Sequence, residues 1–304
     1  MRKLLKYLIP AAAIAAGVGW VVTAPSALPV DAFDGVTGKV ARGEVVFTAA
    51  GCASCHMAPG AEDEAKLVLA GGLRFPSPFG TFLAPNISTD PEHGIGDWDA
   101  RDLANALLHG TSPDGQHYFP AFPYTSYTKM ADRDVADLWA YMQTLPASDT
   151  PSQPHELGFP FNIRRSLGGW KTLFLKPDWV MKGDDLGPDL TRGRYLVEAL
   201  GHCAECHTPR NALGGLDRTR WMAGAPDPSG KGTIPALTPD KLTWSATDIA
   251  YYLETGFTPE FDSAGGHMAH VVSNTAKLST DDRAAIAAYF KALESPATAQ
   301  SAGY

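Results

Sequence analysis

The chain is poor in cysteine and in positive charge, and both shortages restrict what it can be. Its 304 residues include four cysteines, far too few for a disulfide-stapled scaffold of this length. Lysine and arginine total 25 against 33 acidic residues, for a net charge of -8. Because an acidic chain has little attraction for polyphosphate, we expect no nucleic-acid partner.

The chain is also low in charge of either sign, and it lacks the common catalytic signatures. Charged residues make up 19% and hydrophobic residues 44%, which is typical of a globular and not a disordered protein. No serine–histidine–aspartate grouping, phosphate-binding glycine loop or flavin fingerprint stands out. The sequence therefore offers no recognisable substrate site.

The N-terminus has the pattern of a membrane or export segment. The first six residues carry three cations, and an uncharged apolar run of 18 residues follows at positions 7–24. That length is at the short end for a bilayer-spanning helix, and a cleaved signal peptide begins in the same way. We expect residues 1–33 to be a membrane anchor or signal segment. We favour an N-terminal transmembrane helix because Trp20 suits the membrane interface.

The chain repeats itself at an interval of about 146 residues. Three colinear blocks match between the halves, and one of them pairs Trp98, Asp102, Leu103, Leu107, Gly110 and Pro113 with Trp244, Asp248, Ile249, Leu253, Gly256 and Pro259. This duplication predicts one domain at 34–146 and a second at 184–304. Residues 147–183 are rich in proline and in aromatic residues, so we expect an ordered interdomain strap there.

Helical periodicity is the main local signal, and no convincing alternation of period two appears. We expect helices at residues 40–50, 100–108, 132–145 and 279–293. The last opens on Ser279 with acidic residues after it, a helix-capping pattern. The predicted class is all-α, with two tandem domains and the N-terminal transmembrane helix.

All four cysteines fall in two copies of Cys-x-x-Cys-His, one in each domain. The copies are Cys52, Cys55 and His56, and Cys203, Cys206 and His207. This is the signature of c-type haem attachment, because each thiol can add to a haem vinyl group while the adjacent imidazole faces the iron. A structural zinc site would want four ligands, and a thioredoxin-like pair would want a βαβ unit. The sequence predicts two covalently bound haem c groups.

These motifs make the chain resemble a duplicated class I cytochrome c. In that family a glycine and an aromatic residue on the first helix pack against an aliphatic and an aromatic residue on the last. The matching positions are Gly43 and Phe47 with Leu138 and Tyr141, and Gly193 and Val197 with Ile286 and Tyr289. The resemblance implies two tandem class I cytochrome c domains.

Further motifs are similar to those in cytochrome subunits of membrane-bound bacterial dehydrogenases. They include Phe79-Gly80-Thr81-Phe82, Pro85-Asn86-Ile87 and Cys206-His207-Thr208-Pro209-Arg210. The resemblance implies a dihaem electron-transfer protein on the periplasmic side of the bacterial inner membrane. Its donor would be a periplasmic dehydrogenase of the alcohol, gluconate, sorbitol or aldehyde type, and its acceptor a cytochrome, a quinone or an oxidase of the respiratory chain. The alternative is a dihaem redox enzyme such as a peroxidase.

Each haem iron needs a second axial ligand, which in this family is usually a methionine. For haem two we expect Met268, which precedes the last predicted helix, with the flanking His267 and His270 as weaker alternatives. For haem one the family pattern Tyr-Pro-Ala-Met-Pro-Tyr has Phe122 in place of methionine, and phenylalanine cannot ligate iron. We favour Met130 there, with His117 or an open position as alternatives.

The sequence offers further candidates for contacts with the haem propionates and with the ligating histidines. Arg74, Arg210 or Trp98 could reach haem propionates, since arginine suits a carboxylate. The carbonyls of Pro59 and Pro209 could accept the imidazole proton of the ligating histidines.

Overall fold

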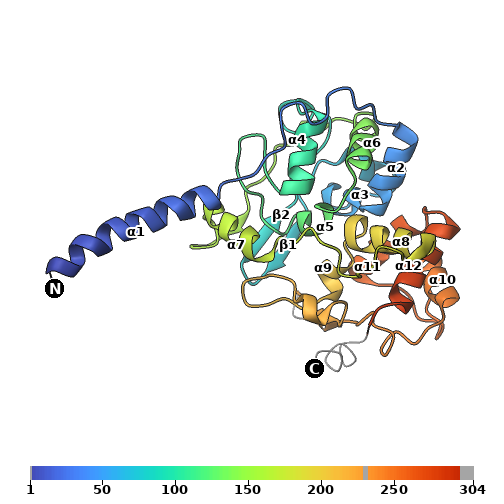
Figure 1. Ribbon diagram of the computed structural model, residues 1–304. Helices are drawn as coiled ribbons and strands as arrows, with labels where there is room; N and C mark the ends of the chain where they lie inside the picture. The colour runs from blue at the N-terminus through green and yellow to red at the C-terminus, as the bar shows by residue number, and fades with distance from the viewer. Residues whose placement is uncertain (1, 229–231, 295–304) are drawn as a thin grey trace.

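The computed structural model of the chain describes residues 2–228 and 232–294, with side chains from residue 7 onward (Figure 1). Helix α1 (Arg2–Val22) projects away from the body of the molecule. Within the described part of the chain, no helix is long and apolar enough to cross a membrane. The expectation of an N-terminal transmembrane helix was therefore wrong. The helix ends at Val22, before the apolar run ends, and its described apolar side chains fall short of the roughly 20 that a bilayer requires.

The first domain is built around two long helices, α2 (Val40–Ala49) and α6 (Asp132–Met142). Between them come α3 (Cys52–His56), η1 (Asp63–Val68), β1 (Arg74–Ser77), β2 (Gly80–Leu83), α4 (Ala100–Ala104), the π-helical turn η2 (Asn105–His109) and α5 (Tyr124–Tyr127). Asp99 caps α4 with a reciprocal bond to Asp102, so the helix begins where its sequence predicts.

The second domain repeats this plan with α8 (Gly187–Tyr195) and α12 (Thr280–Lys291) as its long pair. Between them come η4 (Leu196–Leu200), α9 (Ala204–His207), η5 (Arg218–Arg220), β4 (Ala225–Pro226), β5 (Thr233–Ile234), α10 (Ala246–Thr255) and α11 (Gly266–Thr275). Ser279 caps α12 by accepting a bond from the Asp282 N–H at 3.0 Å, as its capping pattern predicts.

In each domain a glycine lets the first helix approach the last. A Cβ on Gly43 would lie 1.9 Å from the Asp137 carbonyl oxygen, and one on Gly193 would lie 2.1 Å from that of Ala285. Beside the first crossing, the rings of Phe47 and Tyr141 pack in a tilted arrangement with centroids 5.1 Å apart. The helix pairing expected from the cytochrome resemblance is therefore present.

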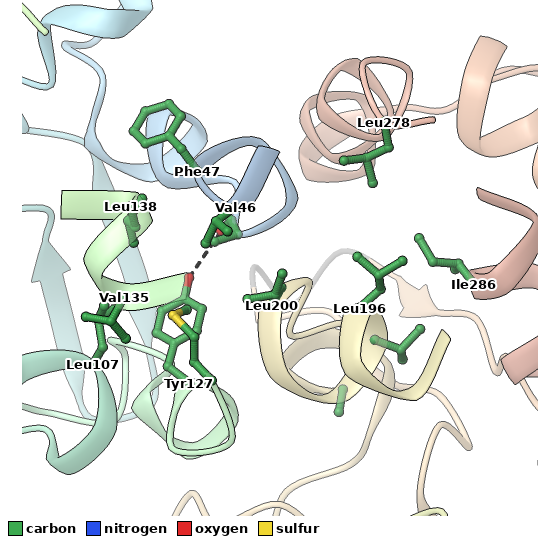
Figure 2. Packing of buried hydrophobic residues seen from close by; sticks show 14 of the residues in the cluster. Val46, Phe47, Leu107, Tyr127, Val135, Leu138, Leu196, Leu200, Leu278 and Ile286 are labelled. Carbon is green, nitrogen blue, oxygen red and sulfur yellow. Dashed lines mark hydrogen bonds between the residues drawn. The ribbon is translucent and has the colours of Figure 1, made fainter. Parts of the chain in front are cut away.

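The two domains share one hydrophobic core. Figure 2 shows Val46 and Leu138 of the first domain on one side, and Leu196, Leu200 and Ile286 of the second on the other. These side chains belong to a single buried cluster. The continuity of this core favours a fixed arrangement of the domains over independent movement.

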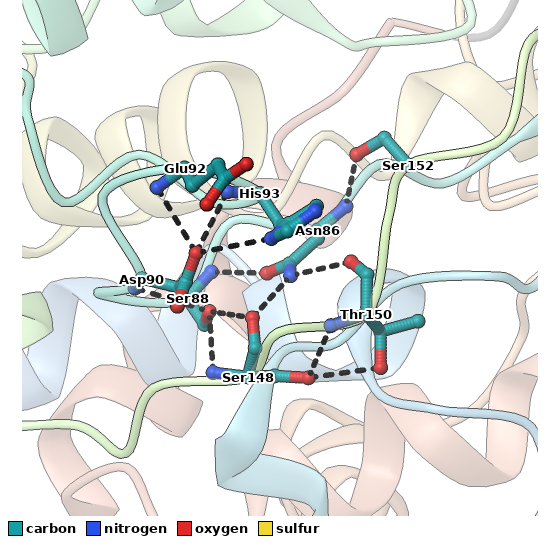
Figure 3. Close-up of polar contacts among 8 residues, drawn as sticks. All are labelled: Asn86, Ser88, Asp90, Glu92, His93, Ser148, Thr150 and Ser152. Carbon is teal, nitrogen blue, oxygen red and sulfur yellow. Dashed lines mark hydrogen bonds and ion pairs between the residues drawn. The ribbon is translucent and has the colours of Figure 1, made fainter.

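The segment 147–183 is ordered and contacts both domains. It contributes β3 (Glu156–Leu157), η3 (Arg164–Ser166) and α7 (Leu167–Phe174). On one side the Asn86 amide donates to the carbonyls of Ser148 and Thr150 at 2.8 and 2.9 Å (Figure 3). On the other, the Trp170 indole donates to the Leu213 carbonyl at 2.9 Å.

The described residues also form two small antiparallel sheets, which the sequence did not predict. One has the order β1-β2-β3, with Arg74 opposite Leu83 and Thr81 opposite Glu156. The other pairs β4 with β5, with Ala225 opposite Ile234. Strands of two to four residues are too short to show a period-two pattern, and β3 pairs with a strand far away in sequence.

Candidate haem-binding sites

The two Cys-x-x-Cys-His motifs lie on short helices with the same local geometry. Helix α3 follows Gly51, whose left-handed backbone at φ 64° turns the chain into the motif. The His56 ring donates from Nδ1 to the Pro85 carbonyl at 2.9 Å, and His207 donates in the same way to Pro235 at 2.7 Å. Each bond fixes the tautomer and leaves Nε2 to face a metal.

The expected acceptors for these rings were wrong. The expected acceptors were the carbonyls of Pro59 and Pro209, but the partners are those of Pro85 and Pro235. Both partners follow the haem motif at similar distances in their repeats, so the comparison of the two halves held a signal for them. Folding, and not closeness in sequence, brings each carbonyl to its histidine.

The four thiols suit haem attachment better than metal binding or disulfide formation. All four are free cysteines, and burial raises the pKa of Cys52 and Cys203 to about 12. Burial therefore favours the neutral thiol at these two positions. Among the described residues no group of three or more histidine, cysteine or acidic side chains is placed to hold a metal ion. Protonated thiols three residues apart beside a fixed imidazole fit a haem c group, which Cys52, Cys55, Cys203 and Cys206 would hold through thioethers.

The candidate sixth ligands lie in different settings. Met268 lies in the first turn of α11, half-buried against the core. Met130 is 4% exposed inside the core, just before α6. His117 is buried, and its Nε2 donates to the Thr23 carbonyl at 3.0 Å. Met268 and Met130 as iron ligands stay predictions.

The arginines expected near haem propionates have other partners. Arg74 forms a two-bond ion pair with Glu156 of β3, at 2.8 and 2.5 Å. Arg210 pairs with Glu205 inside the second motif and donates to the Gly214 carbonyl. Trp98 packs against the core. Neither arginine is free for a propionate without giving up a bond that the fold already makes.

The two haem motifs meet at the boundary between the domains. The His202 ring, next to Cys203, donates from Nε2 to the Ala50 carbonyl at 3.2 Å, two residues before Cys52. The Tyr127 hydroxyl donates to the same carbonyl at 3.1 Å, and its ring meets that of His202 edge to face at 5.8 Å.

Two further contacts bring the motifs together. The pKa of the Cys55 thiol is raised to about 11 by burial and then by the nearby Cys206 thiol. The Asn274 amide on α11 donates to the Ser54 hydroxyl inside the first motif at 2.8 Å. The sequence holds no signal for this arrangement, because the bonds from His202 to Ala50 and from Asn274 to Ser54 join the two repeats.

A family model described as cytochrome c matches residues 40–146 and again residues 190–294. The chain belongs to the cytochrome c family. The two matched stretches contain one Cys-x-x-Cys-His motif each, and the chain accordingly carries two covalently bound haem c groups.

Similar proteins agree with an electron-transfer role. The chain is 57% identical to a "Diheme cytochrome c-type" protein of Cereibacter sphaeroides, over 96% of this chain and 98% of the relative. It is 37% identical to the fructose dehydrogenase cytochrome subunit of Gluconobacter japonicus, over 86% of this chain and 54% of that subunit. It is 34% identical to the gluconate 2-dehydrogenase cytochrome c subunit of Pantoea cypripedii, over 84% of this chain and 59% of that subunit.

The chain covers these relatives to different extents. The chain spans nearly all of the Cereibacter sphaeroides dihaem protein but little more than half of the dehydrogenase subunits. It is therefore a dihaem electron-transfer protein of the cytochrome c family. The donor that it serves is a separate question.

Proposed function

We propose that this cytochrome relays electrons from a periplasmic dehydrogenase to the respiratory chain through its two haems. The observation that carries the proposal is the meeting of the two haem motifs at the Ala50 carbonyl, where His202 and Tyr127 both donate. Electron transfer slows steeply with distance, so two haems anchored beside one shared contact make a continuous path.

The residues of this chain hold and orient the groups that do the redox chemistry. A bound haem c supplies one-electron reduction and oxidation of its iron. His56 and His207, each fixed by its proline carbonyl, hold the imidazole planes in one orientation. The shared apolar core around the motifs excludes water, which keeps reorganisation during electron transfer small.

The donor and the compartment rest on the relatives and on the N-terminal pattern. Several relatives are cytochrome subunits of fructose, alcohol or gluconate dehydrogenases, which supports a dehydrogenase as the donor. The cationic start followed by an apolar run supports export to the periplasmic side. The acceptor is a cytochrome, a quinone or an oxidase, and no enzymatic step on a substrate is assigned to this chain.

The test is reduction by a dehydrogenase in place of a chemical reductant. The intact protein carrying both haems is mixed with a fructose, alcohol or gluconate dehydrogenase that lacks its own cytochrome subunit, together with that enzyme's substrate. Growth of the reduced haem absorbance bands at a rate that saturates with dehydrogenase concentration is expected. If none of the three enzymes reduces the haems although dithionite does, the dehydrogenase donor is wrong.

A dihaem peroxidase is the second candidate, and Phe122 is the observation that favours it. A peroxidase needs one iron with an open position, and phenylalanine stands where the family has a ligating methionine. The reaction would take two electrons and two protons to convert one hydrogen peroxide into two waters. Consumption of peroxide by the reduced protein, at a rate far above that of the Phe122→Met variant, would support it. Equal rates in both proteins would exclude it.

A further inference from the structure

The loop before the sixth-ligand region is the same in both domains. In the first domain the Tyr118 N–H donates to the Gly110 carbonyl at 2.7 Å, and in the second the Ala264 N–H donates to Gly256 at 2.8 Å. The isolated bridges agree, since Thr111 pairs with His117 and Phe257 with Ser263. Each pair of matched positions is 146 residues apart, so the structure fixes the alignment of the two repeats at this loop.

Four residues after the matched bond stand Phe122 in one domain and Met268 in the other. Phe122 is half-buried against the core, and its ring lies 5.8 Å from that of Tyr127. The Tyr127 hydroxyl in turn reaches Ala50, two residues before Cys52. Phe122 therefore lies on the haem side of its domain, in the position that Met268 occupies in the second repeat.

Met130 has the surroundings of a core residue. Its N–H donates to the Tyr127 carbonyl at 2.8 Å, and the Leu278 N–H donates to Thr275 at 3.1 Å. The two side chains are 4% and 6% exposed, and each stands just before the last helix of its domain. Leucine, which cannot ligate iron, fills the same buried place in the second repeat. Packing in the core is therefore a sufficient reason for the methionine at position 130.

His117 is held through one of its two ring nitrogens. The buried Nδ1 has no hydrogen-bond partner among the described residues, whereas Nε2 donates to the Thr23 carbonyl at 3.0 Å. Gly168 of α7 packs so closely that an added Cβ would lie 2.9 Å from this nitrogen. The ring is thus held between the segment after α1 and the strap.

We propose that haem one takes no sixth ligand from this chain, and that the Phe122 side of the haem is a binding site for a small uncharged diatomic molecule such as carbon monoxide or nitric oxide. The wall there is aromatic, with Tyr118 and Tyr127 each 5.8 Å from Phe122. Such a wall disfavours charged ligands, which would lose their hydration. The polarity and access of this side decide what a five-coordinate haem binds. The proposal rests on the two haems and is independent of the electron donor.

The test is the stoichiometry of carbon monoxide binding. The intact dihaem protein is reduced with dithionite and titrated with carbon monoxide, and one molecule bound per chain is expected. Phe122→Met should abolish this binding and, in the oxidised protein, add a second near-infrared sulfur-to-iron band to that of haem two. Met130→Leu is the matched control, and it should still bind one molecule per chain.

Three outcomes would overturn the proposal. Unmodified protein that binds no carbon monoxide, together with binding gained in Met130→Leu, would make Met130 the ligand. The same gain in His117→Gln would make His117 the ligand. Binding of carbon monoxide to both haems of the unmodified protein would show that the haem beside Phe122 is no more open than the haem beside Met268. Because dithionite reduces the haems here without any dehydrogenase, failure of this test is distinguishable from failure of the dehydrogenase test.

Discussion

The His202 imidazole in the second domain donates a hydrogen bond to the Ala50 carbonyl in the first, at 3.2 Å. Each residue lies within two positions of a haem-attaching cysteine, so this bond is a direct structural link between the two haem sites. His202 holds a left-handed backbone at φ 40°, which is uncommon for residues other than glycine. In this conformation its ring reaches across the domain boundary to Ala50.

Replacing His202 with asparagine should loosen this link without straining the backbone, since asparagine tolerates the left-handed region. We expect a loss of about 1–2 kcal/mol in the free energy of unfolding and slower electron exchange between the haems. Flash reduction of one haem, followed by absorbance redistribution, measures the exchange. Tyr127→Phe removes the other bond to Ala50 and serves as the comparison. An unchanged exchange rate in both variants would show that the link carries no electronic role.

Met268→Ala should remove the near-infrared sulfur-to-iron band of one haem and lower that haem's reduction potential, because a thioether ligand favours the reduced iron. Optical spectra and a redox titration of the intact protein check both effects. Met222→Leu is the matched control, since Met222 is fully buried in the same domain. If the near-infrared band is unchanged in Met268→Ala but lost in Met222→Leu, the ligand is Met222 and not Met268.

Gly43→Ala should destabilise the first domain by several kcal/mol, because the new methyl group would overlap the Asp137 carbonyl at 1.9 Å and force α2 away from α6. Urea unfolding followed by circular dichroism gives the change. Gly169→Ala is the control: it lies in α7 with no atom within 4 Å of the added methyl, and alanine there should be neutral or stabilise by about 0.5–1 kcal/mol. Equal effects in the two variants would contradict the close helix crossing.

Acidification should weaken the contact between strap and first domain through His155. The ring accepts the Leu83 N–H at 3.2 Å on Nδ1, and burial and then Arg164 lower its pKa. The unfolded chain therefore takes up a proton at a higher pH than the folded chain does, so stability falls as the pH drops below about 6.5. Thermal unfolding across this window measures the loss.

The matched variants separate His155 from the other histidines. His155→Gln keeps an acceptor for Leu83 but cannot titrate, and it should flatten part of the pH dependence. His270→Gln, on α11 in the second domain, is the control for removing a histidine away from the strap. If His155→Gln keeps the full slope, the acid sensitivity arises elsewhere in the chain.

The sequence by itself determined the features that depend on neighbours along the chain. The haem motifs at Cys52 and Cys203 are complete within a few residues, and the capping at Asp99 and Ser279 is equally local. The internal repeat predicted the two domains, because a duplication can be recognised from the sequence alone. The apolar run at the N-terminus was local too, but a run of that composition does not distinguish a helix that crosses a bilayer from one that does not.

Only the tertiary structure decided the features that join distant residues. The carbonyls of Pro85 and Pro235 accept hydrogen bonds from haem-motif histidines 29 and 28 residues away. Strand β3 at residues 156–157 pairs with β2 at residues 80–83. The bond from His202 to Ala50 spans 152 residues. None of these partners leaves a periodic trace in the sequence, since a backbone carbonyl is present at every residue and only folding selects which one is used.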